Sequence, residues 1–123
     1  MRRVARWGEG FVSGGLPPDA ARRLYDVAEQ AWREAGRPGR PRFAAGTYWA
    51  LGPDAAAKAA AYITHYYGYL GPAAEQMAAG VPSTPDAVRA MIRAFEDVGV
   101  DELVMWPCAA EVDQVDRLAE LAG

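Results

Sequence analysis

The sequence predicts an α/β protein in which parallel strands alternate with helices. Three short apolar segments have strand character, and each leads through a turn rich in Gly or Pro into a segment whose apolar residues have helical spacing. Strands separated by helices of this length pair in parallel through right-handed crossovers. A chain of 123 residues has room for a single domain, residues 1–123, with one modest core.

The first part of the chain is predicted to contain a helix end, a strand and a long helix. Residues 2–7 fit the last turns of a helix, and the lack of a helix start indicates further sequence upstream. Phe11-Val12 forms a short buried strand that exits through the turn Ser13-Gly14-Gly15. Pro17-Pro18-Asp19 then begins a helix that stops at Gly36.

Aromatic and small residues predict a second strand over residues 42–51. It is followed by an alanine-rich helix over residues 54–69, several of whose later residues are tyrosines, and by a short helical stretch over residues 72–79. A tyrosine-rich helix of this kind is rarely free in solvent, so we expect it to pack against the rest of the chain.

The last part of the chain repeats the pattern of helix, strand and helix. Ser83-Thr84-Pro85-Asp86 caps a helix that is closed by Gly99, a third strand covers residues 102–106, and a final helix covers residues 113–122. Three parallel strands leave two open edges. We therefore expect a partner, either a second copy of the chain or further strands, to cover them.

Composition narrows the function classes. The net charge is only −3, which gives no reason to expect a nucleic-acid partner. The single cysteine, Cys108, forms no disulfide within the chain, and no Cys/His cluster has metal-ligand spacing. Because there is also no signal peptide and no long apolar run, we expect a cytoplasmic protein that does not bind a membrane.

Four segments in order resemble the carboxy-terminal part of bacterial-luciferase-like, flavin-dependent monooxygenases. These segments are residues 2–11 (RRVARWGEGF), 35–38 (AGRP), 99–104 (GVDELV) and 113–119 (DQVDRLA). Each one alone is a common phrase of helix, turn and strand. Their order and spacing match the family over essentially the whole chain.

The resemblance implies a TIM-type (β/α) barrel, of which this chain would supply only the last three strands. The complete barrel has eight strands and about 250 residues, and its site is built at the carboxyl ends of the strands. The family implies a cofactor across that mouth, either FMN or, in one branch, a deazaflavin coenzyme. The cofactor supplies the redox chemistry.

The resemblance also suggests a cofactor site at Ser13, Gly14 and Gly15, where the family's loop approaches the cofactor phosphate. Glycines there permit close backbone approach, and N–H groups with a hydroxyl satisfy an anion. The alternative is that a turn from strand to helix needs glycines with or without a ligand. The family's other flavin contacts lie on earlier strands, which have no counterpart in this sequence.

Aromatic residues at strand ends are candidates for a substrate pocket. Tyr48 and Trp49 end the second strand, and alternation sends one towards the barrel interior and the other beneath the helices, whereas Trp106 ends the third. The alternative for all three is core packing. The lone His65 and Cys108 have no partner that would make them catalytic, so no catalytic residue and no metal ligand is predicted.

Two functions therefore compete. In the first, the chain is part of a luciferase-like oxidoreductase or monooxygenase, contributes to the cofactor phosphate site and is inactive alone. In the second, it is a non-catalytic, self-associating scaffold or interaction module derived from that barrel. A binding protein that kept a flavin or phosphate site but lost the chemistry lies between the two.

Overall fold

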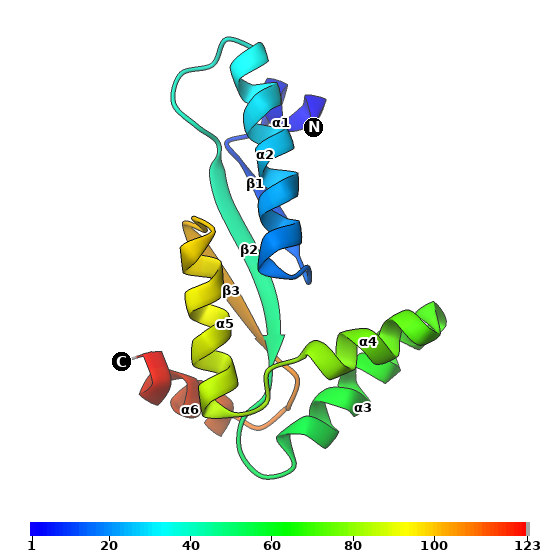
Figure 1. The fold of residues 1–123 in the computed structure, drawn as a ribbon. Helices are drawn as coiled ribbons and strands as arrows, with labels where there is room; N and C mark the ends of the chain where they lie inside the picture. Colours follow the sequence, from blue (N-terminus) through cyan, green and yellow to red (C-terminus); the bar gives the residue numbers. More distant parts are fainter. Residues whose placement is uncertain (123) are drawn as a thin grey trace. The chain divides into compact units, whose positions relative to one another are not determined.

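A computed structural model describes residues 1–122 of the chain. Within these residues, three parallel strands form one open sheet in the order β1-β2-β3. The elements in chain order (Figure 1) are α1 (Arg2–Trp7), β1 (Gly10–Gly14), α2 (Pro18–Glu34), β2 (Arg42–Trp49), α3 (Ala55–Tyr67), the 3-10 turn η1 (Gly68–Leu70), α4 (Pro72–Gly80), α5 (Pro85–Asp97), β3 (Glu102–Pro107) and α6 (Asp113–Ala122). The predicted α/β class with a parallel sheet is confirmed.

The predicted element bounds differ from the structure mainly at strand ends. β1 continues through Ser13 and Gly14, which pair with Ala45 and Gly46 of β2, so the turn begins only at Gly15. The sequence suggested an earlier exit because glycine is disfavoured within strands. Here the pairing with β2 overrides that preference.

The chain divides into two compact units. The first contains residues 1–47 and 92–104, and the second contains residues 48–91 together with the chain from Met105 on. The divisions fall inside β2, α5 and β3.

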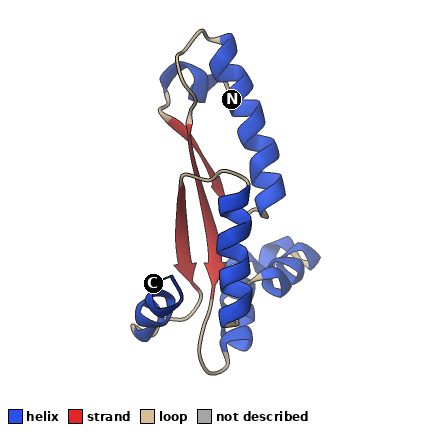
Figure 2. Cartoon of the chain, turned by 60° about the vertical axis from the view of Figure 1, so that its left-hand side comes forward, coloured by secondary structure: helices blue, strands red, loops and turns tan. Residues whose placement is uncertain are grey.

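In the first unit, α2 packs against β1 and the first part of β2 (Figure 2). Its buried residues Ala21, Tyr25, Ala28 and Trp32 recur every three or four positions and so share one helix face. Tyr25 stacks on Phe43 of β2, with ring centroids 4.3 Å apart. Its hydroxyl donates a 2.7 Å hydrogen bond to the Pro41 carbonyl. The ring of this buried side chain is therefore packed and its polar group is hydrogen-bonded.

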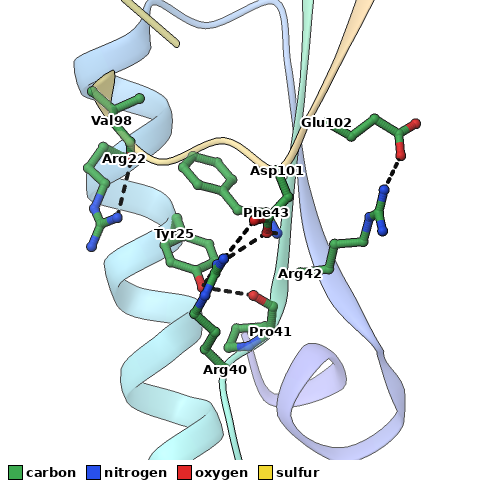
Figure 3. A network of polar contacts seen from close by, with 9 residues as sticks. All are labelled: Arg22, Tyr25, Arg40, Pro41, Arg42, Phe43, Val98, Asp101 and Glu102. Atoms are coloured by element: carbon green, nitrogen blue, oxygen red, sulfur yellow. Dashed lines mark hydrogen bonds and ion pairs between the residues drawn. The ribbon is translucent and has the colours of Figure 1, made fainter. Parts of the chain in front are cut away.

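Residues at the start of β2 are joined to the start of β3 by a polar network (Figure 3). The Asp101 carboxylate accepts hydrogen bonds from two guanidinium nitrogens of Arg40, at 2.6 and 3.1 Å, and from the Phe43 N–H at 2.8 Å. Arg42 pairs with Glu102 beside it. Because the Asp101 N–H also donates to the Phe43 carbonyl at 2.7 Å, the carboxylate and the backbone fix the same register.

In the second unit, small side chains form the core and larger ones surround it. Ala50, Ala55, Ala59, Ile63 and Cys108 are buried together. Partly buried residues pack around them, namely Tyr48, Tyr62, Tyr67, Met77, Ala78 and Val81. Alanine on one face of α3 lets neighbouring elements approach closely, which explains why this helix is so rich in it.

A buried glutamine anchors α6 to the loop that follows β2. The Gln114 side chain donates a hydrogen bond to the Leu51 carbonyl at 2.7 Å and accepts one from the Leu51 N–H at 3.1 Å. Both backbone groups of a buried loop residue are thereby paired, as buried amides require. Within residues 1–122, no helix is long and apolar enough to span a membrane.

Candidate functional site

The exit of β1 combines a buried hydroxyl with open glycine backbone. Ser13 is 3% exposed, and its Oγ has no hydrogen-bond partner among the described residues. Gly14 lies opposite Gly46 on β2, and the Gly15 N–H donates to the Gly46 carbonyl at 3.1 Å. Gly15 has φ +70°, which favours glycine. Gly14 and Gly15 are exposed, so their backbone is open to a ligand, whereas Gly46 is buried.

The start of α2 is less suited to an anion than many helix starts. Pro17 and Pro18 occupy its N-cap and first position and carry no N–H to donate. Asp19 follows, and its hydrogen bond with Arg23, with a smaller contribution from the Ala20 N–H, lowers the pKa of the carboxyl, which is therefore ionised. A phosphate here would meet a negative charge. Any anion contact at this exit therefore depends on the glycine backbone and the Ser13 hydroxyl.

Aromatic side chains from the ends of β2 and β3 come together in the second unit. The rings of Tyr48 and Trp106 lie 5.2 Å apart between centroids. Two tyrosines of α3 complete the group, because Tyr48 lies 5.8 Å from Tyr62 and 6.0 Å from Tyr67. The hydroxyls of Tyr48 and Tyr67 share a 2.5 Å hydrogen bond. We call Tyr48, Tyr62, Tyr67 and Trp106 the aromatic cluster.

Trp49, the third predicted pocket residue, does not join this cluster. It is 1% exposed, and its indole Nε1 has no hydrogen-bond partner among the described residues. Successive side chains of a strand point to opposite faces, so Trp49 and Tyr48 diverge as the alternation argument predicts. Two of the three residues therefore lie together, and the third is buried elsewhere.

The two α3 tyrosines of the cluster were not predicted as site residues. Tyr62 and Tyr66 are four positions apart and their ring centroids are 4.7 Å apart, the contact that helical spacing favours. The four-residue spacing of Tyr62 and Tyr66 was the signal in the sequence that tyrosines of this helix lie side by side. Nothing local to the helix indicates that Tyr62 and Tyr67 meet Tyr48, because this contact depends on how the helix packs.

Burial keeps two phenols of the aromatic cluster and a neighbouring thiol in their neutral forms. Burial raises the pKa of Tyr48, and the hydrogen bond with Tyr67 raises it further. Burial also raises the pKa of Tyr62, and it raises the pKa of the neighbouring Cys108 thiol to about 11. These groups stay protonated at neutral pH. The cluster therefore suits an uncharged ring or alkyl group and offers no anionic base or thiolate nucleophile.

His65 lies on the exposed side of α3 and meets the Tyr66 ring edge-on, 4.9 Å away between centroids. Among residues 1–122, no group of three or more His, Cys, Asp or Glu side chains is placed to hold a metal ion.

Three parallel strands in an open sheet, each followed by one or more helices, are consistent with part of a TIM-type barrel. In comparisons of sequence, no family model and no curated protein matches the chain. A solved structure does match: an F420-dependent secondary alcohol dehydrogenase in complex with an F420-acetone adduct, with a TM-score of 0.72 and 16% identity. The match covers 98% of this chain and 44% of that protein, so the chain spans less than half of its length. At this identity the likeness shows the fold alone.

Proposed function

We propose that the chain is part of a luciferase-like, coenzyme-dependent oxidoreductase barrel that further β/α units complete. The observation that carries this proposal is the fold match to an oxidoreductase over 98% of the chain. The aromatic cluster supports it, since Tyr48 and Trp106 stand at strand carboxyl ends, where sites of this barrel class are built.

A deazaflavin coenzyme of the F420 type is the cofactor we favour, because the solved protein of the same fold binds F420. FMN, with a monooxygenase reaction, is the second candidate, supported by the sequence resemblance. When bound, either coenzyme would supply the redox chemistry. In this proposal the open backbone of Gly14 and Gly15 approaches the coenzyme phosphate, and the unpaired Ser13 hydroxyl is the side-chain donor.

The substrate in this proposal is small and uncharged. Tyr48, Tyr62 and the Cys108 thiol stay protonated at neutral pH because burial raises the pKa of each, so an alcohol or ketone meets no adverse charge from them. Trp49 is 1% exposed, so in this proposal it packs in the core and does not contact the substrate. The single buried thiol, Cys108, suits a reducing compartment such as the cytoplasm.

A chimeric barrel tests the proposal. This chain replaces the matching 44% of the F420-dependent dehydrogenase, and binding of F420 and FMN is followed by coenzyme fluorescence. We expect saturable binding that the double variant Ser13→Ala, Gly14→Ala weakens. Gly80→Ala is the matched control, because a Cβ there meets open space. A chimera that is folded by circular dichroism and binds neither coenzyme would refute the proposal.

The scaffold function is the second candidate, and a specific observation favours it. Val12 of β1 is 68% exposed and Val104 of β3 is 38% exposed, so apolar strand residues are uncovered in the first unit. Such residues can pair with a second copy of the chain. A self-associating chain whose chimera binds no coenzyme would establish this alternative.

A further inference from the structure

We propose that Trp106, Tyr48, Tyr62 and Tyr66 form a chain of oxidisable rings that conducts an oxidising equivalent from the exit of β3 to the surface of α3. Successive ring centroids along this chain are 5.2, 5.8 and 4.7 Å apart. All four residues belong to the second unit. The inference goes beyond the proposed function and does not depend on coenzyme binding.

The distances are those of rings in or near van der Waals contact. Electron tunnelling between two groups slows steeply as their separation grows, so each step between neighbours is much faster than a direct step from one end to the other. Indole and phenol are the side-chain rings that lose an electron most readily. The four rings therefore offer three short steps where one long step would otherwise be needed.

Exposure gives the chain a direction. Trp106, Tyr48 and Tyr62 are half-buried, whereas Tyr66 is 57% exposed. A tyrosine that loses an electron becomes a neutral radical only if its phenolic proton also leaves. Tyr48 and Tyr62 are half-buried, so water has less access to take the proton from either phenol. Tyr66 can release its proton to water, so the radical comes to rest there.

Other groups near the path are poor end points. The Cys108 thiol is buried and stays protonated, because its pKa is raised to about 11, and a protonated thiol resists oxidation. Tyr67 is a side branch, since its hydroxyl is hydrogen-bonded to Tyr48 and its ring is half-buried. The route to Tyr66 is therefore the one that ends in solvent.

The overall step is balanced. A one-electron oxidant, such as an oxygen-derived radical, takes one electron from the Trp106 indole and is reduced. Electrons then move inward from Tyr48, Tyr62 and Tyr66 in turn, so each inner ring regains its electron and only Tyr66 remains oxidised. Its phenolic proton passes to water. Such a chain would remove oxidising equivalents from Trp106 before they damage the residues around it.

Pulse radiolysis with the azide radical, which oxidises indole in preference to phenol, tests the chain directly. The experiment uses the full chain with Trp7→Phe, because Trp7 is 76% exposed and would compete with Trp106. The remaining tryptophans, Trp32 and Trp49, are buried. Transient absorption follows decay of the tryptophan radical and growth of the tyrosyl radical. A nitroso spin trap with peptide mass spectrometry locates where the radical stops.

We expect first-order conversion of the tryptophan radical into a tyrosyl radical, at a rate independent of protein concentration, and an adduct on Tyr66. Tyr48→Phe should slow the conversion, and Tyr62→Phe should remove most of the Tyr66 adduct while leaving the first conversion intact. Tyr69→Phe is the control, because Tyr69 is 81% exposed and lies outside the chain of rings. Circular dichroism confirms that each variant is folded.

Two outcomes would overturn the inference. One is a tryptophan radical whose decay is the same with Tyr48→Phe. The other is a Tyr66 adduct that persists unchanged with Tyr62→Phe, since Tyr66 would then be oxidised directly from solvent.

Discussion

Single side chains in this molecule bind residues that are far away along the sequence. The carboxylate of Asp101 is the clearest case, because it binds Arg40 and the Phe43 N–H, about sixty positions away along the chain. Its pKa is lowered, first by the hydrogen bond from Arg40 and then by the one from Phe43. The ionised form is thus tied to the folded state, and stability should depend on pH.

Acid should weaken the fold through Asp101. A carboxyl whose folded pKa lies below its ordinary value of 3.8 contributes stability above that value and loses it as the pH falls towards the lowered pKa. We expect the urea concentration at the midpoint of unfolding to decrease as the pH is lowered below about 4. Asp101→Asn should be less stable at pH 7 and should show a smaller drop in acid. An equal drop in both proteins would mean that other carboxylates dominate.

Alkali should weaken the fold through Cys108. Its pKa rises from an ordinary 9.0 to about 11 in the folded protein, with burial as the cause. Between these values the unfolded chain loses the thiol proton while the folded chain keeps it, so stability falls as pH rises. Chemical unfolding from pH 8 to 11 measures the effect. Cys108→Ala should remove this part of the slope at some cost in core packing.

At the scale of whole elements, a close backbone contact positions one strand and a side-chain hydrogen bond positions one helix. Gly10 begins β1 beside Arg42 of β2, and a Cβ built on Gly10 would stand 2.5 Å from the Arg42 carbonyl oxygen. The α6 helix is tied by Gln114 to both backbone groups of Leu51. Each of these contacts can be broken by one substitution.

Gly10→Ala should force β1 away from β2. The neighbour that it meets is backbone, which cannot rotate aside, so the cost should be about 1–3 kcal/mol in free energy of unfolding. Thermal unfolding followed by circular dichroism measures it. Gly80→Ala in α4 is the control, because nothing lies within 4 Å of its added Cβ. Alanine there should be neutral or stabilise by up to about 1 kcal/mol.

Gln114→Leu should loosen α6. The substitution leaves the Leu51 N–H and carbonyl buried without a partner, at a cost of about 1–3 kcal/mol for each group left unpaired. The exposed Gln76→Leu in the same unit is the control and should change stability little. Urea unfolding distinguishes the two variants. Hydrogen exchange at the Leu51 N–H should rise only in Gln114→Leu.

Spacing of apolar residues and turn signals, which are local properties, predicted the α-helices and strands of residues 1–122 in their order, but the helix predicted over residues 54–69 gives way to the 3-10 turn η1. These signals were also less accurate at the end of β1, where pairing of Gly14 with Gly46 extends the strand. The meeting of Tyr48 with Trp106 was foreseeable from their places at strand ends. Their contact with Tyr62 and Tyr67 was not, since it depends on the packing of α3.

For the molecule as a whole, the two outer strands of the sheet are the feature from which self-association can be predicted. β1 and β3 have β2 as their neighbour on one side, and within residues 1–122 no further strand pairs with either. Parallel strands in such barrels are normally flanked on both sides. The uncovered Val12 and Val104 add apolar surface in the first unit.

The chain should therefore self-associate at high concentration. Val12→Lys should weaken the association, because a charge on an edge strand opposes pairing, and stability should be retained since Val12 is 68% exposed. Val115→Lys is the matched control, because Val115 is 66% exposed and lies on the helix α6, not on a strand. Sedimentation velocity over a range of concentrations measures both. Equal weakening by the two variants would indicate a general charge effect.

The interleaving of the two compact units has a consequence for dissecting the protein. Each unit draws on two separate stretches of sequence, and the crossings fall inside β2, α5 and β3. A protease that nicks an exposed turn, such as residues 37–40, leaves part of at least one unit on each fragment. A single cut there divides the first unit between the two fragments, whereas every residue of the second unit stays on the carboxy-terminal fragment. Complementation between the two nicked fragments is thus the informative experiment, because it reports on reassembly of the first unit.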